Sequence, residues 1–312
     1  MREIKEFKDV DRLMLANKPV IQESNSVSFV NDDLSLKLIE EDDFYYLKVL
    51  NNTLYFQIGG ENNLNVKLED TVKCKNGLWG LVTAFSITND RFYIFHQEKD
   101  QTPKFLILDK KLDVVRQAAK GCNYGINNYL FRCFGNKILC FDIQSEEALW
   151  ELELESIVNQ NSFLLASDNV FATLKSGQLL AIDISTGELK WKQESVGRIA
   201  LFEDKIYCIA DYKIKELDAS SGEIQREESM QSLIDAYGFR PTGAHKVYDE
   251  YIFAMASGKP GMVAIYSRKT LKFQEMLKLD EMIPMGTDHL HWHNGKLYVL
   301  DFGKTLHVYD KE

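Results

Sequence analysis

The chain has 312 residues, 45% of them hydrophobic and 27% charged, which is enough apolar material for a large globular core. Its formal net charge is −10, because 47 acidic residues outnumber 37 basic ones. Nucleic acid and anionic membranes require a basic protein face, so this charge argues against both and favours a basic macromolecule as partner.

The N-terminal segment, MREIKEFKDVDRLMLANK, is charged throughout and holds no apolar core of signal-peptide length. No apolar run reaches the roughly 18 residues that a membrane-spanning helix needs. The five cysteines include no C-x-x-C pair, and several, such as Cys140 and Cys208, lie in apolar runs typical of buried free thiols. We therefore expect a protein of the reducing cytoplasm.

One plan of strands and turns repeats along the chain. Each unit carries a short apolar run, in most units closed by aspartate, as in KFLILD, KILCFD, LLAID and TLHVYD. Asparagine and aspartate turns, such as Asn127-Asn128 and Asn294-Gly295, join the strands. In chain order, the units lie near 26–58, 81–117, 121–154, 162–193, 197–228, 243–278 and 288–310.

These units predict an all-β fold, because four short strands repeating about every 33 to 46 residues are typical of propeller blades. We expect a seven-bladed β-propeller of four-stranded antiparallel blades, forming a single domain over residues 1–312. The seventh unit ends after its third strand, which would leave a strand edge and apolar blade faces exposed. We expect a closing strand over 18–24, built on the run PVIQ, to supply the missing outer strand and close the ring.

The clearest copy of the repeat is GQLLAIDISTGELKWK at 177–192. It resembles the repeat of quinoprotein alcohol dehydrogenase-like propellers, in which a glycine, a strand ending in Leu-Asp, a Thr-Gly turn and an outer-strand tryptophan follow one another. The matching residues are Gly177, Asp183, Thr186, Gly187 and Trp191, with partial matches at Asp142, Trp150, Asp218, Ser221 and Gly222. We expect Gly187 to occupy a left-handed backbone position and Trp191 to fill the wedge between two blades.

The resemblance implies a propeller scaffold without the family's cofactor. Family enzymes that bind the quinone use acids lining the channel to hold a metal ion, and many carry adjacent cysteines, which this chain lacks. Family members that assemble outer-membrane proteins are exported lipoproteins, and no export signal is recognisable here. We therefore expect no cofactor and no catalytic residues, since the chain also lacks G-x-S-x-G, P-loop and H-E-x-x-H motifs.

The segment DHLHWH (288–293) is the strongest candidate for a metal site. On a strand, His289, His291 and His293 would point to one face, near the channel, where two neighbours could share a zinc ion but all three could not. Alternating histidines without a partner ligand at fixed spacing are a weak pattern. Hydrogen-bonded imidazoles on a polar inner strand are the plainer interpretation.

The longest connections, at 59–80 and 229–242, are predicted to lie at one rim with the loops at 41–43, 97–103 and 257–261. Loops at one rim carry function in propellers, and exposed aromatic side chains anchor interfaces. The partner surface is predicted to contain Glu41, Asp42, Asp43, Glu61, Glu69, Asp70, Trp79, Glu98, Asp100, Tyr237 and Phe239.

An acidic propeller with such a rim is predicted to be a non-catalytic protein-binding protein. In its most specific form it would be an immunity protein that neutralises a basic nuclease toxin, with acidic side chains imitating substrate phosphates and speeding association. Bacterial toxin-immunity proteins resemble this profile: acidic, cytoplasmic, single-domain, and monomeric apart from the partner. Two alternatives stay open, namely a metal- or quinone-dependent enzyme with its site in the channel, and a scaffold subunit of a larger complex.

Overall fold

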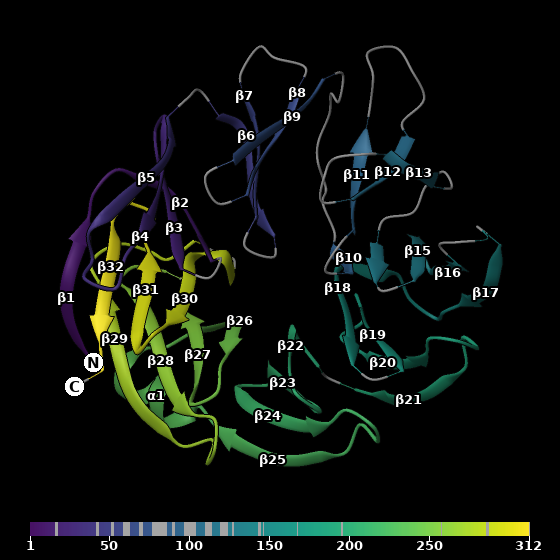
Figure 1. The fold of residues 1–312 in the computed structure, drawn as a ribbon. Helices are drawn as coiled ribbons and strands as arrows, with labels where there is room; N and C mark the ends of the chain where they lie inside the picture. Colours follow the sequence, from purple (N-terminus) through teal and green to yellow (C-terminus); the bar gives the residue numbers. More distant parts are fainter. Residues whose placement is uncertain are drawn as a thin grey trace. The chain divides into compact units, whose positions relative to one another are not determined.

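The structure is a computed structural model, and Figure 1 shows its fold. It describes residues 1–15, 18–41, 44–50, 53–58, 63–68, 71–76, 86–88, 91–96, 104–109, 114–118, 124–126, 128–142, 145, 147–166, 168–194, 196–256, 258–284 and 287–311. The chain divides into two compact units. The larger unit contains Met1–Ile39, Asn159–Ile184 and Glu188–Glu312, and the smaller contains Glu40–Val158 and Ser185–Gly187.

The described strands form eight four-stranded sheets, each built from strands that follow one another in the chain except at the termini. Five of the sheets lie mainly in the larger unit. The first two are β2 (Val10–Leu15), β3 (Pro19–Glu23), β4 (Ser26–Val30) and β5 (Leu36–Glu41), and then β18 (Val158–Ala166), β19 (Asn169–Leu174), β20 (Leu179–Asp183) and β21 (Leu189–Gln193). The other three are β22 (Ile199–Phe202), β23 (Lys205–Ala210), β24 (Lys213–Asp218) and β25 (Ile224–Ser229); β26 (Pro241–Val247), β27 (Tyr251–Ala256), β28 (Gly261–Ser267) and β29 (Phe273–Leu279); and β30 (Leu290–His293), β31 (Lys296–Leu300), β32 (Leu306–Asp310) and β1 (Arg2–Phe7). A helix, α1 (Gln231–Tyr237), precedes β26, and a 3-10 turn, η1 (Thr287–His289), precedes β30.

The smaller unit contains the other three sheets. These are β6 (Phe44–Leu50), β7 (Thr53–Ile58), β8 (Asn63–Leu68) and β9 (Thr71–Asn76); β10 (Ser86–Thr88), β11 (Arg91–His96), β12 (Lys104–Asp109) and β13 (Val114–Ala118); and β14 (Tyr124–Ile126), β15 (Tyr129–Phe134), β16 (Lys137–Asp142) and β17 (Ala148–Glu153).

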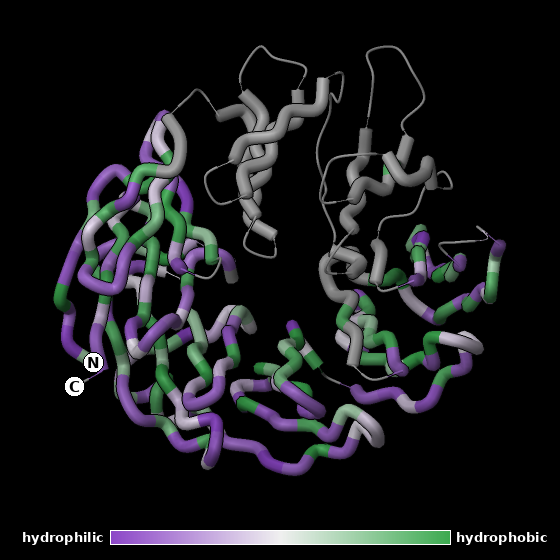
Figure 2. The backbone as a smooth tube through the Cα atoms, in the orientation of Figure 1, coloured by the Kyte–Doolittle hydropathy of each residue, from purple (hydrophilic) through white to green (hydrophobic). Residues whose placement is uncertain are grey.

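Burial follows position within each sheet. The middle strands β19 and β27 are buried at every residue, as expected for strands covered on both faces. The outer strands β21 and β25 contain no buried residue and alternate exposed with half-buried positions over much of their length. Figure 2 shows hydrophilic colour running along β25. The core of the larger unit therefore lies between neighbouring sheets, against their middle strands.

The expectation of seven sheets is wrong, and the error lies near the N-terminus. The predicted unit 26–58 combines the end of one sheet, β4 and β5, with the start of the next, β6 and β7. The segment 59–80, expected to be a loop, contains β8 and β9. The sequence stretches between these strands are all short and mostly polar, so the sequence does not mark where one sheet ends and the next begins.

The predicted closing strand is also wrong. Residues 19–23 form β3, a middle strand whose first four residues are buried. Instead β1 pairs antiparallel with β32, from Arg2 opposite Asp310 to Phe7 opposite Leu306, and completes the last sheet (Figure 1). The physical reason lies in the pattern: PVIQ is apolar on both faces, whereas REIKEF exposes five charged or apolar residues and buries only Phe7, as an outer strand can.

The repeat glycines and tryptophans contact each other across neighbouring sheets. Gly222, in the turn after β24, has φ +74° and faces the Trp191 ring of the preceding sheet, and a Cβ there would lie 2.6 Å from Trp191 Cε3. Gly187 has φ +75° and faces Trp150 in the same way, at 2.6 Å from Cδ2. The Trp191 indole N–H also donates to the Ala219 carbonyl, at 3.3 Å. The expected left-handed glycine and wedge tryptophan are confirmed. Each of the two glycines has two reasons to lack a side chain: its positive φ, and the tryptophan ring that a Cβ would clash with.

Candidate functional site

Strand order places two kinds of connection at the same end of every sheet in the larger unit. In an antiparallel sheet of consecutive strands, the turn between the second and third strands lies at the end where the chain leaves for the next sheet. We call this end the connection rim. In the described residues it includes the turns at 211–212 and 301–305, the connection at 230–240, and residues 280–284 and 287–289 of the next connection.

Exposed hydrophobic side chains gather on this rim. Phe302 is 64% exposed, Tyr212 58%, Tyr237 40% and Met282 38%. The other exposed large hydrophobics of the larger unit's described residues all lie on outermost strands: Ile4, Leu36, Leu38, Leu189 and Ile224. Scattered apolar residues are normal on a surface, but the three exposed aromatic rings of the larger unit's described residues all lie at this end, and exposed aromatic rings are typical of a binding surface.

Tyr212 is held by a strained turn. Both residues of the turn between β23 and β24, Asp211 and Tyr212, have positive φ, at +53° and +56°. Two non-glycine residues in this region cost about 1–2 kcal/mol each. The Met230 N–H donates to the Tyr212 carbonyl at 2.8 Å, which helps to hold the turn. The turn therefore presents an exposed aromatic ring from a fixed backbone.

Phe302 and Met282 form a second exposed apolar group. The Phe302 N–H donates to the Met282 carbonyl at 2.7 Å, joining the turn after β31 to the connection after β29. Within that turn, the Thr305 N–H donates to Asp301 Oδ1 at 2.8 Å. The turn that carries Phe302 is thus held by one hydrogen bond to the connection after β29 and by another within the turn itself.

Most of the predicted partner surface lies outside the described residues: Asp42, Asp43, Glu61, Glu69, Asp70, Trp79, Glu98 and Asp100. Glu41 is the last residue of β5, and nothing of its side chain is described. Tyr237 lies on the rim, with its ring centroid 6.3 Å from that of Phe273 and the Lys278 ammonium 5.2 Å away.

The expectation that Phe239 is exposed is wrong, because it is fully buried. The connection at 229–242 contains α1, and Gly238 ends that helix in a left-handed conformation, with φ +67°. The chain then turns Phe239 into a core cluster with Met230 and Leu233. The apolar residues at 230, 233 and 234 followed by Gly238 are a helix signal that sequence reasoning missed.

The three histidines of DHLHWH do not form a shared metal site in the described residues. His289 belongs to η1 and only His291 and His293 to β30, so the expectation of one strand face is wrong for His289. Ligand atoms of the three do not converge within 4.8 Å. Burial lowers the pKa of all three imidazoles, and with the nearby Lys246 ammonium it lowers the pKa of His291 to about 4. They are therefore neutral at pH 7.

Each of these imidazoles keeps one buried ring nitrogen without a hydrogen-bond partner among the described residues. These atoms are His289 Nδ1, His291 Nε2 and His293 Nε2. Leaving such an atom unpaired costs about 1–3 kcal/mol. The cost makes the segment of η1 and β30, at the end strand of its sheet, a second candidate ligand site.

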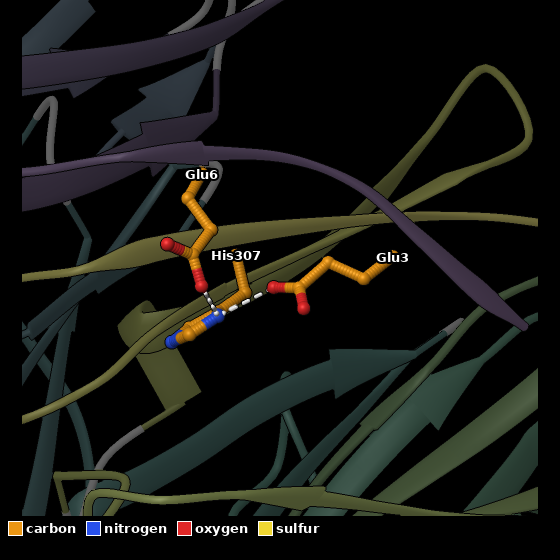
Figure 3. A group of neighbouring side chains, drawn as sticks. All are labelled: Glu3, Glu6 and His307. Atoms are coloured by element: carbon orange, nitrogen blue, oxygen red, sulfur yellow. Dashed lines mark hydrogen bonds and ion pairs between the residues drawn. The ribbon is translucent and has the colours of Figure 1, made fainter.

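A different group of potential metal ligands lies where β1 meets β32: Glu3, Glu6 and His307 (Figure 3). His307 Nδ1 lies 2.6 Å from Glu3 Oε1 and 3.5 Å from Glu6 Oε1. Its other nitrogen, Nε2, lies 2.9 Å from Asp301 Oδ2. Among the described residues, this is the one group of three or more histidine, cysteine or acidic side chains whose ligand atoms converge within 4.8 Å.

Comparisons with known proteins identify the scaffold. A family model described as outer membrane protein assembly factor BamB matches residues 134–282. The crystal structure of BamB from Moraxella catarrhalis is similar with a TM-score of 0.63 and 13% identity, covering 99% of both chains. The C-terminal WD40 domain of Sif2 has a TM-score of 0.69 at 10% identity, covering 100% of this chain and 98% of that one. The fold is a β-propeller, and its scaffold is of the PQQ type.

Two further similar proteins, one an enzyme and one uncharacterized, do not assign a function to this chain. Dihydro-heme d1 dehydrogenase NirN is similar with a TM-score of 0.63 and 11% identity, covering 89% of this chain and 66% of that one. The uncharacterized protein RC0314 of Rickettsia conorii is 28% identical over 116 residues, which span 34% of this chain and 28% of that protein's length. Solved structures similar in fold thus include a dehydrogenase as well as an assembly factor and a WD40 domain. No helix among the described residues is long and apolar enough to span a membrane.

Proposed function

We propose that the protein is a non-catalytic binding propeller whose partner docks on the connection rim. The observation that carries the proposal is that the exposed aromatic side chains of the larger unit's described residues, Tyr212, Tyr237 and Phe302, all lie at this end. Tyr212 and Phe302 fit the role of interface anchors, because each is a large aromatic ring on a turn held by backbone hydrogen bonds. A rigid anchor loses little conformational entropy when a partner binds.

Charge supports a basic partner. Two of the rim's exposed basic side chains, Lys259 and Lys304, form ion pairs with Glu281 and Asp11, at 2.5 and 2.6 Å, so their charges are compensated within the chain, while Lys175, Arg198 and Arg240 are also exposed on this rim. Exposed carboxylates remain on the same rim at Asp235, Asp280 and Asp288. With a net charge of −10, the protein attracts a basic partner over long range and speeds association.

In its most specific form, the proposal is an immunity protein that neutralises a basic nuclease toxin in the cytoplasm. A nuclease binds phosphates through a basic cleft, and carboxylates on a rigid rim offer the same charge to that cleft. The aromatic rings of the rim would then cover the apolar surface beside it. An immunity protein needs no catalytic residues, in keeping with the absence of catalytic motifs from the sequence.

A capture experiment from the native host tests the rim directly. The wild-type chain, a rim variant (Tyr212→Ala with Phe302→Ala) and a matched control (Leu189→Ala with Ile224→Ala) serve as baits. The control removes exposed apolar groups from outer strands instead of the rim. We expect one basic protein with the wild-type and control baits, about tenfold or greater weakening with the rim variant, and slower association at higher salt.

The captured protein then decides between the forms of the proposal. If it is a nuclease that the propeller inhibits at a one-to-one ratio, the immunity function stands. Capture of several proteins in one complex would favour a scaffold subunit. Equal capture by the wild-type and the rim variant, or capture of an acidic partner, would refute docking on this rim.

An enzyme remains the second candidate because three buried imidazole nitrogens have no hydrogen-bond partner in the part of the chain that the structure describes. A metal ion or a quinone would have to bind at the edge where β30 and η1 lie. Triple substitution of His289, His291 and His293 by glutamine would abolish such binding while changing only His289 among the rim residues. Partner capture that survives the triple substitution would separate the two candidates.

A further inference from the structure

The pairing of β1 with β32 brings together a group of side chains that can bind a metal ion and that no sequence motif indicates. In the register of β1 against β32, Glu6 lies opposite His307 and Glu3 opposite Tyr309. An irregularity between Glu3 and Lys5 adds one residue to β1. Because side chains alternate along a strand, Glu3 and Glu6 would otherwise lie on opposite faces, and the extra residue brings both to the face of His307.

A buried carboxylate fixes the orientation of the His307 ring. Asp301 is only 6% exposed, and its Oδ1 accepts the Thr305 N–H while its Oδ2 lies 2.9 Å from His307 Nε2. A carboxylate can only accept, so Nε2 carries the hydrogen and donates it to Asp301. The lone-pair position of Nδ1 then faces Glu3 Oε1 and Glu6 Oε1 (Figure 3).

Three electron-rich atoms meeting at one point require a positive charge between them. That charge is either a second proton on the imidazole or a metal ion. Lys8 does not supply it, because its ammonium pairs with the other oxygen of Glu6, Oε2, at 2.9 Å. Glu6 Oε1 is thus directed toward His307 while Oε2 is occupied.

We propose that Glu3, Glu6 and His307 bind a divalent transition metal ion, with zinc the best match. One imidazole nitrogen and two carboxylate oxygens form a ligand set that zinc accepts, with water in the fourth position. A carboxylate holding the far nitrogen of a ligand histidine, as Asp301 does, is the arrangement that orients and strengthens such ligands. This site is distinct from the rim proposed to bind a partner.

The distances require only a small adjustment. Zinc bonds of about 2.0–2.2 Å in tetrahedral geometry separate the ligand atoms by about 3.3–3.5 Å. The separation of 3.5 Å between Nδ1 and Glu6 Oε1 already fits. The contact between Nδ1 and Glu3 Oε1, at 2.6 Å, must widen, and the Glu3 side chain, 39% exposed, is free enough to move. The bound ion would tie β1 to β32 and so stabilise the last sheet.

Zinc titration of tag-free protein tests the site. After treatment with a chelator and dialysis, elemental analysis gives stoichiometry, and calorimetry gives affinity. We expect one zinc ion per chain and a higher Tm with zinc for the wild-type and for a control carrying His291→Gln and His293→Gln. Glu3→Gln with Glu6→Gln, exposed and nearly isosteric, should lose this binding, and Asp301→Asn should weaken it about 10–100-fold.

The alternative is an imidazolium, and the same experiment identifies it. If the Glu3/Glu6 variant binds zinc as tightly as the wild-type, the ion binds elsewhere and the proposal is wrong. If the wild-type takes up no zinc and nitrogen NMR shows both His307 ring nitrogens protonated, a proton occupies the site and the proposal is again wrong. Loss of zinc confined to the Glu3/Glu6 and Asp301 variants supports it.

Discussion

Replacement of Gly222 by alanine tests the contact that joins neighbouring sheets. The change adds one methyl group at a position with φ +74°, 2.6 Å from Trp191 Cε3 and 2.7 Å from Cδ2. Real Cβ atoms do not approach a ring this closely, so either the turn or the indole must move. Because the indole N–H bonds to the Ala219 carbonyl, movement of the ring also strains that hydrogen bond.

The expected cost has two parts. A non-glycine residue in the left-handed region costs about 1–2 kcal/mol. Forcing an extra methyl group against a packed ring costs about 1–3 kcal/mol more. The gain from a less flexible unfolded chain, about 0.4–1 kcal/mol, offsets part of this. We therefore expect Gly222→Ala to destabilise the protein by about 2–4 kcal/mol.

Gly295→Ala is the matched control, because Gly295 has φ +75° and, its chain neighbours aside, no atom of the described residues lies within 4 Å of its Cβ position. Urea unfolding followed by circular dichroism should place the Gly222 variant about 1–3 kcal/mol below this control. In a Trp191→Leu background, the two alanine substitutions should cost nearly the same. If the two substitutions cost the same in the wild-type background, the prediction is wrong, because the destabilisation would then come from the positive φ alone and not from contact with Trp191.

Three further predictions concern single side chains of the larger unit. Arg226→Met leaves the Glu216 carboxylate, which is 4% exposed, without its ion pair, so we expect the free energy of unfolding in urea to fall by about 2–3 kcal/mol. Adding Glu216→Met should restore most of that free energy. A fall below about 1 kcal/mol would contradict this prediction. His291 has a folded pKa of about 4 against about 6.5 when unfolded, so the unfolded chain binds the extra proton first and stability falls as pH falls between those values. His291→Gln should reduce that fall by up to about 3 kcal/mol between pH 7 and pH 4, and unchanged pH dependence would argue against a buried neutral imidazole. Phe239→Ala should cost about 3–5 kcal/mol in thermal unfolding while Tyr237→Ala costs less than about 1 kcal/mol, and similar costs would contradict their burial.

The middle strands could be predicted from the sequence because their burial depends on local pattern alone. Runs such as LLAID are apolar on both faces, which only a strand covered on both sides explains. Five predicted units, from 81–117 to 243–278, coincide with a sheet to within a few residues, and the last, 288–310, covers three of the four strands of its sheet. The first did not, because only two residues, both acidic, separate β5 from β6, and short polar stretches of this kind also occur in the sequence inside sheets.

The candidate sites depend on long-range contacts that the sequence does not display. Glu3 and His307 lie at opposite ends of the chain, and Glu3 reaches the shared face only through a register irregularity in β1. Tyr212 occupies a positive-φ turn without the glycine or asparagine that usually marks one. Phe239 and Tyr237 are neighbours in sequence, yet a helix and its glycine cap bury one and expose the other.

Asp301 connects the two proposed sites. Its Oδ1 accepts the Thr305 N–H and so closes the turn that presents Phe302 on the connection rim, while its Oδ2 holds His307 beside Glu3 and Glu6. A metal ion bound by His307 would polarise the imidazole N–H and so strengthen the hydrogen bond that this N–H donates to the Asp301 carboxylate. The turn would then open less readily, and Phe302 would meet a partner from a more rigid backbone. Metal binding where the chain ends pair and partner binding on the rim are therefore expected to favour each other, through one carboxylate that both require.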